Sequence, residues 1–382
     1  MADRLQSIRQ ILVDQQLEAL LISQPENLRY LSGFTGREGY LLITAERAVL
    51  ATDSRYVEQA SWQAPLFEVV LVVGEPEQTF ELLLDRLFLA EKEDAEHSET
   101  MLLGPGSAPL PRLGFEADSL SFATYRRLEP IAERRSLDLV PTSGLVEELR
   151  MVKDDGELRE IEKAVAVTDE AYAHLLNVLR PGMTEKEAAW EIEKYEREHG
   201  AEAVAFDIIV ASGPQAALPH AEPSDKPIVQ GETIVIDMGA RANGYNSDLT
   251  RTICLGTPPD ELRRIYEVVL NAQEAALAGI QAGMTGAAAD ALARQVIESA
   301  GYGEAFGHSL GHGLGLAVHE MPGLRRQSAQ ILRDGMVFTV EPGIYLPGRG
   351  GVRIEDTVVL ENGRVRVLSK AAKSRELGSK RR

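Results

Sequence analysis

Two segments of this chain, residues 179–200 and 280–302, are alike, and this repeat restricts the folds that the chain can adopt. The first reads LRPGMTEKEAAWEIEKYEREHG and the second IQAGMTGAAADALARQVIESAGY. Each contains Gly-Met-Thr, continues with a helical pattern and has a glycine after it, so Thr184 and Thr285 are predicted to cap two related helices. Chance similarity of helix caps could explain this tripeptide alone.

The spacing between the copies persists in the residues around them. Four pairs repeat at similar separations: Gly182 and Gly283 (101 residues), His220 and His319 (99), Asp237 and Glu341 (104), and Asp248 and Glu355 (107). Chance does not readily explain four separations that nearly agree. We therefore expect two related halves that pack face to face, with a site between them.

Residues 307–320, GHSLGHGLGLAVHE, are rich in both glycine and histidine. Glycine inside a regular element costs about 0.5–1 kcal/mol relative to alanine, so this composition indicates backbone that must approach something closely. Imidazoles beside such backbone favour a metal or a polarised substrate, and the alternative is a glycine-rich loop with ordinary histidines. The carboxylates on either side of the stretch favour the metal.

The first pair of acids falls in a predicted hairpin with Asn243-Gly244 at its turn. In that register Asp237 faces Thr250, and Asp248 lies diagonal to Asp237 on the same face, about 7–8 Å away at Cα and within reach of a shared ion. A polar residue at a strand end is the alternative for Asp237. Its strand looks buried, however, and a buried carboxylate needs a counter-charge, for which Arg241 and Arg251 are the alternatives to a metal.

The second half repeats this arrangement in MVFTVEPG and VRIEDTVVL. Arg353 and Glu355 share one face at strand period two, whereas Asp356 points the other way and is predicted to be structural. The candidate ligands from both halves are Asp237, Asp248, His312, Glu341 and Glu355. Four carboxylates and one imidazole suit two bridged divalent cations, with Mn²⁺ or Co²⁺ favoured and Zn²⁺ as an alternative.

The rest of the chain predicts two domains and a tail. Residues 1–144 alternate short apolar runs with helical patterns, which predicts an α/β domain with a mixed or parallel sheet. Residues 145–370 hold the repeat, and the basic, pattern-free residues 371–382 are predicted to be a frayed tail. The glycine-rich residues 33–39 lack the Lys-Ser/Thr ending of a phosphate loop, so we expect a turn there.

Composition restricts the partners and the compartment. The net charge of −19 argues against nucleic acid or an anionic membrane as a partner. The single cysteine, Cys254, excludes an internal disulfide and fits a reducing compartment. No apolar run reaches the ~18–20 residues of a membrane span, and the charged start is not a signal peptide, so a cytoplasmic protein is expected.

These motifs resemble the metal site of the M24 metallopeptidases, which have the pita-bread fold. The matched positions are Asp237 in IDMGA, Asp248 in SDLTRT, His312 in GHGLG, Glu341 in EPGIY and Glu355 in RIED. The first domain is similar to the creatinase-type N-terminal domain of proline-specific members. The resemblance implies an α/β N-terminal domain, an α+β catalytic domain with internal pseudo-twofold duplication, and a homodimer.

The resemblance also implies a reaction, which is hydrolysis of the Xaa-Pro bond of dipeptides or short peptides. Two metals would lower the pKa of a bridging water to give hydroxide, and Glu341 would also handle the proton. His220, His308 and His319 match histidines that bind substrate and stabilise the tetrahedral intermediate, with packing as the alternative for His308. Arg353 matches an arginine beside the ligands.

One departure leaves the substrate length open. Many prolidases carry an arginine for the dipeptide carboxylate four residues after the histidine that matches His319, and this chain has Gly323 there. Arg325 or Arg326 could substitute, or Arg37 could reach in from a dimer partner. The expected activity is therefore Xaa-Pro dipeptidase, with Xaa-Pro aminopeptidase as the alternative. A non-catalytic binding protein and a redox or phosphate enzyme remain further alternatives, weakened respectively by the intact ligands and by the absence of a cofactor motif.

Overall fold

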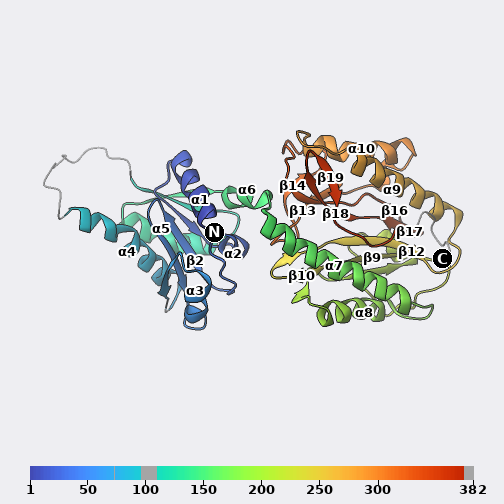
Figure 1. Cartoon of the computed structure of the whole chain (residues 1–382), viewed down its shortest axis with the longest axis horizontal. Helices are drawn as coiled ribbons and strands as arrows, with labels where there is room; N and C mark the ends of the chain where they lie inside the picture. The colour runs from blue at the N-terminus through green and yellow to red at the C-terminus, as the bar shows by residue number, and fades with distance from the viewer. Residues whose placement is uncertain (73, 96–109, 374–382) are drawn as a thin grey trace. The chain divides into compact units, whose positions relative to one another are not determined.

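The computed structural model describes residues 1–72, 74–95 and 110–373, with side chains from 87 to 95 left out, and the chain divides into two compact units, Met1–Arg150 and Met151–Arg382 (Figure 1). The predicted domain boundary at residue 144 lies at the start of α6 (Leu145–Met151). That helix is tied to the first unit because Arg150 Nη1 and Glu147 Oε1 both hydrogen-bond the Asn27 amide, at 2.8 and 2.6 Å.

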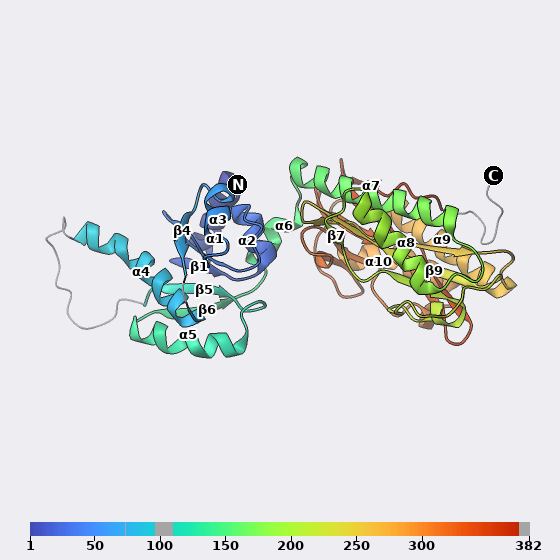
Figure 2. The ribbon, with the colours of Figure 1, turned by 90° about the horizontal axis from the view of Figure 1, so that it is seen from below.

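The N-terminal unit is a six-stranded sheet in the order β4-β3-β2-β1-β5-β6. The sheet is mixed, which is one of the two predicted arrangements, because β1 pairs antiparallel with β2 and parallel with β5. Helices α4 and α5 pack together on one face and α1, α2 and α3 lie on the other (Figure 2). Its elements are α1 (Ala2–Gln15), β1 (Ala19–Ile22), α2 (Pro25–Ser32), β2 (Tyr40–Thr44), β3 (Ala48–Thr52), α3 (Val57–Gln63), β4 (Glu68–Leu71), α4 (Pro76–Ala95), β5 (Arg112–Glu116), α5 (Phe122–Arg134) and β6 (Asp138–Thr142).

The C-terminal unit places its strands between two pairs of long helices, α7 with α8 on one side and α9 with α10 on the other (Figure 1). Its helices are α7 (Asp155–Val178), α8 (Glu185–Glu198), α9 (Asp260–Gly279) and α10 (Gly286–Ser299), with short 3₁₀ turns at Gly213–Ala217 and Gly303–Ala305. Its strands are β7 (Ala203–Val204), β8 (Ile209–Ser212), β9 (Thr233–Met238), β10 (Ala240–Ala242), β11 (Tyr245–Asn246), β12 (Leu249–Cys254), β13 (Gly311–Gly313), β14 (Glu320–Leu324), β15 (Val337–Val340), β16 (Gly343–Leu346), β17 (Gly350–Arg353), β18 (Asp356–Glu361) and β19 (Arg364–Val367).

The two halves of this unit use the same local structure, which confirms the predicted duplication. Thr184 and Thr285 accept hydrogen bonds from the third backbone N–H of α8 and α10 respectively. The preceding glycines both have positive φ, +86° at Gly182 and +88° at Gly283. Matching backbone bonds follow: Gly182 N donates to Ile228 O at 2.8 Å, and Gly283 N to Leu332 O at 2.9 Å. Two similar sequences therefore build two similar lobes.

The predicted hairpin register is confirmed. Thr250 lies opposite Asp237 in the pairing of β12 with β9, and Ala242 lies opposite Tyr245 beside the Asn243-Gly244 turn. Both turn residues have positive φ, as a two-residue hairpin turn requires. A short turn of fixed geometry sets which residues face each other, and so it places Asp237 and Asp248 on one face.

Strand β12 of the first lobe is hydrogen-bonded to residues 353–357 of the second. Glu355 N donates to Thr250 O at 3.1 Å, and Thr252 Oγ1 both donates to Arg353 O and accepts from Arg353 N, at 2.8 and 3.0 Å. Thr357 Oγ1 donates to Asp248 O at 2.8 Å. These bonds bring the acids of the two lobes together.

The beginning of the predicted tail is ordered, so the prediction of fraying from residue 371 is wrong for residues 371–373. Ala371 N donates to Asp169 Oδ1 and Lys373 Nζ to Asp356 Oδ2, both at 2.7 Å. Long-range partners that a pattern-free sequence does not reveal hold this segment. Residues 374–382 lie outside the part of the chain that the structure describes. In the described part, no helix combines the length and apolar character needed to cross a bilayer.

Candidate metal centre

A cleft of about 530 Å³ in the C-terminal unit collects nine of the residues that the sequence singled out. Both lobes contribute to it: the candidate ligands Asp237, Asp248, His312, Glu341 and Glu355, together with His220, His308, His319 and Arg353. The side chains come from strand ends and the glycine-rich stretch, where close packing leaves no room for a Cβ. At Gly311, for example, a Cβ would lie 1.9 Å from Thr339 O.

His312 lies between acids of both lobes. Its Nε2 is 3.5 Å from Asp248 Oδ2 and 3.3 Å from Glu341 Oε1. Single ligand atoms of Asp248, His312 and Glu355 all lie within 4.8 Å of one another. A carbonyl oxygen can only accept, so His312 Nδ1 donates to Gly313 O at 3.0 Å and Nε2 faces the carboxylates. Burial acts downward on the pKa of His312, but Glu341 outweighs it and raises that pKa, so a metal ion at Nε2 would replace a proton.

Two buried carboxylate oxygens in the cleft have no hydrogen-bond partner among the described residues, namely Asp237 Oδ1 and Glu355 Oε1. The second oxygen of each carboxylate is hydrogen-bonded. Arg353 Nη2 donates to Asp237 Oδ2 at 2.5 Å, and Thr250 Oγ1 donates to Glu355 Oε2 at 2.6 Å. Each acid is thus oriented by one oxygen and presents the other to the cleft. A buried polar atom without a partner is costly, and a cation would satisfy it.

The acids disturb one another electrostatically. Burial, reinforced by the neighbouring carboxylates, raises the pKa of Glu355 and of Asp248 well above its usual range. Burial also raises the pKa of Asp237, against the effect of Arg353. For Glu341 burial acts upward, but His312, His308 and Arg353 outweigh it and lower the pKa to about 2. Arg353 and one imidazole do not neutralise four acids.

The residues therefore fit divalent cations. The cluster offers hard carboxylate oxygens, one correctly oriented imidazole nitrogen, two oxygens without a partner and an excess of negative charge, all from lobes held together by strand hydrogen bonds. Oxygen-rich sites of this kind suit Mn²⁺ or Co²⁺, and a single imidazole also permits Zn²⁺.

The three additional histidines differ in their surroundings. His220 and His319 are exposed at the cleft, and the His319 ring centroid lies 4.2 Å from that of His312. His308 is partly buried, and its Nδ1 bonds Ser309 O while its Nε2 accepts from Tyr345 Oη at 2.9 Å. Burial lowers the pKa of His308, which favours this neutral form. Arg353 Nη1 donates to Tyr345 Oη in turn, at 3.0 Å.

Arg37 and Arg325 are not among the residues that line the metal cleft. Arg37 is exposed in the glycine-rich loop of the N-terminal unit. Arg325 is exposed at the edge of a second cleft of about 630 Å³, which shares His308 and Ser309 with the first. Arg326 lines the second cleft too, and its Nη2 lies 3.4 Å from Glu298 Oε1.

Sequence reasoning missed several side chains that hold the site. Thr339 Oγ1 donates to Glu341 Oε1 and accepts from His312 N, both at 3.1 Å, and Tyr345 joins His308 to Arg353. Period-two spacing, Thr339 to Glu341 and Thr250 to Asp248, was a signal that could have found the threonines. The apolar wall of the cleft was missed as well, and it includes Phe206, Ile208, Ile209, Pro219 and Val318.

Solved structures share this two-unit architecture and define the class. The chain superimposes on an Xaa-Pro dipeptidase from Bacillus anthracis with a TM-score of 0.88 and 41% identity, covering 98% of each chain. It matches an X-Pro aminopeptidase from Thermotoga maritima with a TM-score of 0.83 and 38% identity, covering 97% of this chain and 98% of the other. The fold is thus an α/β N-terminal domain followed by a pita-bread catalytic domain, the architecture of metal-dependent hydrolases of this class.

Sequence comparison gives the family. Residues 159–362 match the metallopeptidase family M24, and residues 4–152 match the creatinase/prolidase N-terminal domain. An Xaa-Pro dipeptidase of Pyrococcus furiosus is 36% identical over 372 residues, which covers 96% of this chain and 98% of the relative. The chain belongs to metallopeptidase family M24.

Proposed function

We propose that this enzyme hydrolyses the Xaa-Pro bond of dipeptides and short peptides with two divalent ions. Asp237, Asp248, His312, Glu341 and Glu355 are the proposed ligands. The observation that carries the proposal is that acids of both lobes meet in one cleft with two buried oxygens left without partners in the described structure. The relatives named Xaa-Pro dipeptidase support the substrate class.

Two bound divalent ions would supply Lewis-acid activation of the peptide carbonyl and of an attacking water. The protein's own residues would then orient the reacting groups and transfer protons. Glu341, whose pKa is lowered to about 2 chiefly by its hydrogen bond to His312, would accept the proton from the water and pass it to the departing proline nitrogen. Arg353 would hold Asp237 in place.

The histidines would contact substrate. His220 and His319 are exposed at the cleft from opposite lobes and can donate hydrogen bonds to the substrate and to the tetrahedral intermediate. His308 would contribute at the cleft wall, where Tyr345 fixes its ring. The apolar wall that includes Phe206 and Val318 suits a proline ring.

The substrate carboxylate would be held by a cation outside the cluster. We propose Arg325, at the edge of the second cleft, and Arg37, acting from the other copy of a homodimer. Sedimentation equilibrium tests the dimer. Replacing Arg325 with Met should raise the KM for Ala-Pro several-fold with little change in kcat, because a binding contact is lost in ground and transition states alike.

A second candidate is Xaa-Pro aminopeptidase activity on longer peptides. Gly323 adds no cationic side chain at its position, and the second cleft adjoins the metal cleft through His308 and Ser309, which leaves room for residues beyond proline. Comparing kcat/KM for Ala-Pro and Ala-Pro-Ala separates the two. A preference for the dipeptide supports the first proposal, and a preference for the tripeptide supports the second.

The metal proposal is tested by analysis of the purified protein and by reconstitution. We propose Mn²⁺ as the most effective ion, with Co²⁺ and Zn²⁺ as alternatives. The chelated enzyme should regain hydrolysis of Ala-Pro with Mn²⁺, and Glu355→Ala should not. Full activity in that variant would contradict the assignment. We also propose a cytoplasmic location, which fits the single cysteine.

A further inference from the structure

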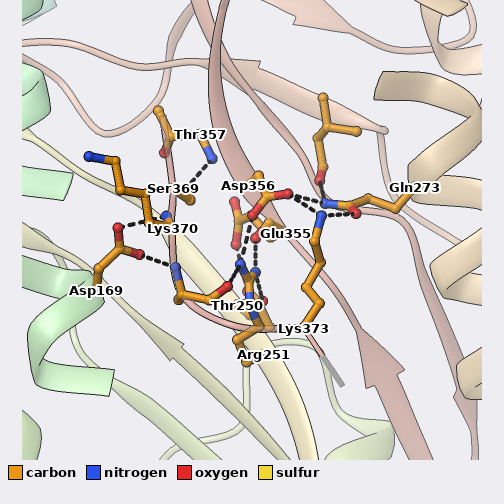
Figure 3. Close-up of polar contacts among 12 residues, drawn as sticks. Asp169, Thr250, Arg251, Gln273, Glu355, Asp356, Thr357, Ser369, Lys370 and Lys373 are labelled. Carbon is orange, nitrogen blue, oxygen red and sulfur yellow. Dashed lines mark hydrogen bonds and ion pairs between the residues drawn. The ribbon is translucent and has the colours of Figure 1, made fainter. Parts of the chain in front are cut away.

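Residues 369–373 make a set of polar contacts with the segments that carry the proposed ligands (Figure 3), and Ala371 also packs on the apolar core that includes Ile236. Lys370 N and Ala371 N donate to the two oxygens of Asp169 on α7, each at 2.7 Å. Ser369 Oγ accepts from Thr357 N at 3.0 Å, and Ala371 O accepts from Arg251 Nη2 at 2.8 Å. We call residues 369–373 the C-terminal strap.

The strap contributes one charge to a buried cluster around Asp356. Lys373 Nζ donates to Asp356 Oδ2 at 2.7 Å and to Gln273 Oε1 at 2.9 Å, while Arg251 Nη2 donates to Asp356 Oδ1 at 2.7 Å. Gln273 Nε2 also reaches Asp356 Oδ2, at 2.8 Å. Asp356, Gln273 and Arg251 are buried, whereas the Lys373 side chain keeps 25% of its surface exposed.

This cluster and the strap are hydrogen-bonded to the main chain of two proposed ligands, Glu355 and Asp248, on the side away from the cleft. Arg251 Nη1 donates to the carbonyl oxygens of Glu355 and Thr250. Thr357, whose backbone N–H is bonded to the strap, donates through Oγ1 to Asp248 O at 2.8 Å. Asp356 is the sequence neighbour of Glu355, so a shift of its carboxylate would turn the strand that presents Glu355 to the cleft.

We infer that the C-terminal strap is a positioning element for the metal centre, with Lys373 as its positioning residue. Lys373 fixes Asp356, Asp356 fixes Arg251, and Arg251 fixes the main chain of Glu355 and Thr250. The inference rests on the proposed metal function of Glu355 and Asp248. Partners outside the coordination sphere that orient ligands typically change metal affinity about 10- to 100-fold when they are removed.

The test uses the full-length protein, stripped of metal, and titrates it with Mn²⁺ by calorimetry. Lys373→Met keeps the aliphatic stem and removes the charge, and it should weaken Mn²⁺ binding about 10- to 100-fold. Lys373→Arg should restore most of the affinity. Lys370→Met is the matched control, because it removes the same charge from an exposed side chain of the strap, and it should bind Mn²⁺ as the unmodified protein does.

Asp169→Asn provides a second route, since it weakens the anchor of the strap on α7 without touching Asp356. It should weaken Mn²⁺ binding in the same direction, with a smaller change than Lys373→Met. Thermal melts of each metal-free variant show whether it is folded. If Lys373→Met does not fold, the Asp169→Asn and Lys370→Met pair decides.

Two failures are distinguishable. If the folded Lys373 and Asp169 variants bind Mn²⁺ as the unmodified protein does, the strap has no positioning role and the inference is overturned. If the unmodified protein itself binds no Mn²⁺, Co²⁺ or Zn²⁺, the proposed function fails and the inference falls with it. Equal weakening in Lys373→Met and Lys370→Met would also overturn it, because net charge rather than the strap contact would be the cause.

Discussion

Glu355 and Asp356 are adjacent in sequence and almost fully buried, at 1% and 0% exposure, yet they occupy opposite electrostatic environments. Asp356 receives hydrogen bonds on both oxygens from Arg251, Gln273 and Lys373. Glu355 receives one from Thr250, and its second oxygen has no partner in the described residues. Strand alternation sends the two side chains to opposite faces of one chain segment.

The difference teaches how a binding acid is told from a structural one. On the face away from the cleft, the cations Arg251 and Lys373 pair with the single carboxylate of Asp356, and both of its oxygens accept hydrogen bonds. In the cleft, four carboxylates share Arg353 and an imidazole, and two oxygens remain free among the described side chains. Burial alone does not separate the two acids. The local balance of charge and the unsatisfied oxygen do.

The largest expected effect comes from replacing Glu355, the acid that faces the cleft. Glu355→Gln should lower kcat/KM for Ala-Pro at least about 10³-fold, because a Lewis-acid centre supplies several kcal/mol of transition-state stabilisation. The metal-free variant should nevertheless be at least as stable as the metal-free parent, since a repelled buried acid has become neutral. Urea unfolding in the presence of a chelator measures the free energy of unfolding of both metal-free proteins. A clear loss of stability in Glu355→Gln would contradict the proposed difference between Glu355 and Asp356.

Replacing Asp356, the acid on the opposite face, should have the opposite effect on the stability of the metal-free protein. Asp356→Asn leaves Arg251 buried without its ionic partner, and removing one member of a buried pair costs about 3–5 kcal/mol of unfolding free energy. The same urea titration of the metal-free protein provides the measurement. If Asp356→Asn were no more destabilising than Glu355→Gln, the distinction between the two faces would fail.

The sequence predicted the parts of the site that depend on local rules. A two-residue Asn-Gly turn fixes register, so the pairing of Asp237 with Thr250 followed directly. Helix caps have strong side-chain preferences, so Thr184 and Thr285 were recognisable. Strand alternation alone predicts that Glu355 and Asp356 point to opposite faces.

The parts that could not be predicted depend on contacts between the lobes. Arg353, not Arg241 or Arg251, pairs with Asp237, because residues 353–357 lie against β12. Arg251 instead turns to the rear and meets Asp356. Lys373 belongs to a segment without any periodic pattern, and its partner is fixed only by the crossing of distant strands. Spacing along the chain carries no information about such pairs.

A third buried acid sharpens the comparison, because it lies outside the cleft and has no cation partner among the described residues. Glu196 is 0% exposed, its Oε1 lies 3.5 Å from Thr168 Oγ1, and its Oε2 is unpartnered in the described structure. Burial raises its pKa to about 8. The folded protein therefore keeps a proton that the unfolded chain releases near its ordinary value of 4.5, and this acid makes stability fall as pH rises between those values.

Glu196→Gln should remove that part of the pH dependence. At pH 8 the variant should be more stable than the parent by roughly 1–4 kcal/mol, and the difference should shrink towards pH 5. Both proteins are compared without metal, so that the acids of the cleft contribute equally to each. A stability difference that does not change with pH would mean that Glu196 is already ionised and has a counter-charge, as Asp356 has.

The smallest expected effect compares the two lobes at their caps. Thr184 takes part in a capping box, in which Glu187 Oε2 also accepts from Thr184 N at 2.8 Å, whereas the corresponding position after Thr285 is Ala288. Each Thr→Ala substitution should cost about 1 kcal/mol, and Thr184→Ala should cost slightly more because it also removes the hydroxyl that bonds Glu187. The urea midpoint of unfolding, at an unchanged dependence of the unfolding free energy on urea concentration, measures the loss of stability in each variant. Equal losses would show that the second lobe, without the reciprocal glutamate, derives the same stability from its threonine alone, and the asymmetry between the lobes would then lie only in their charged residues.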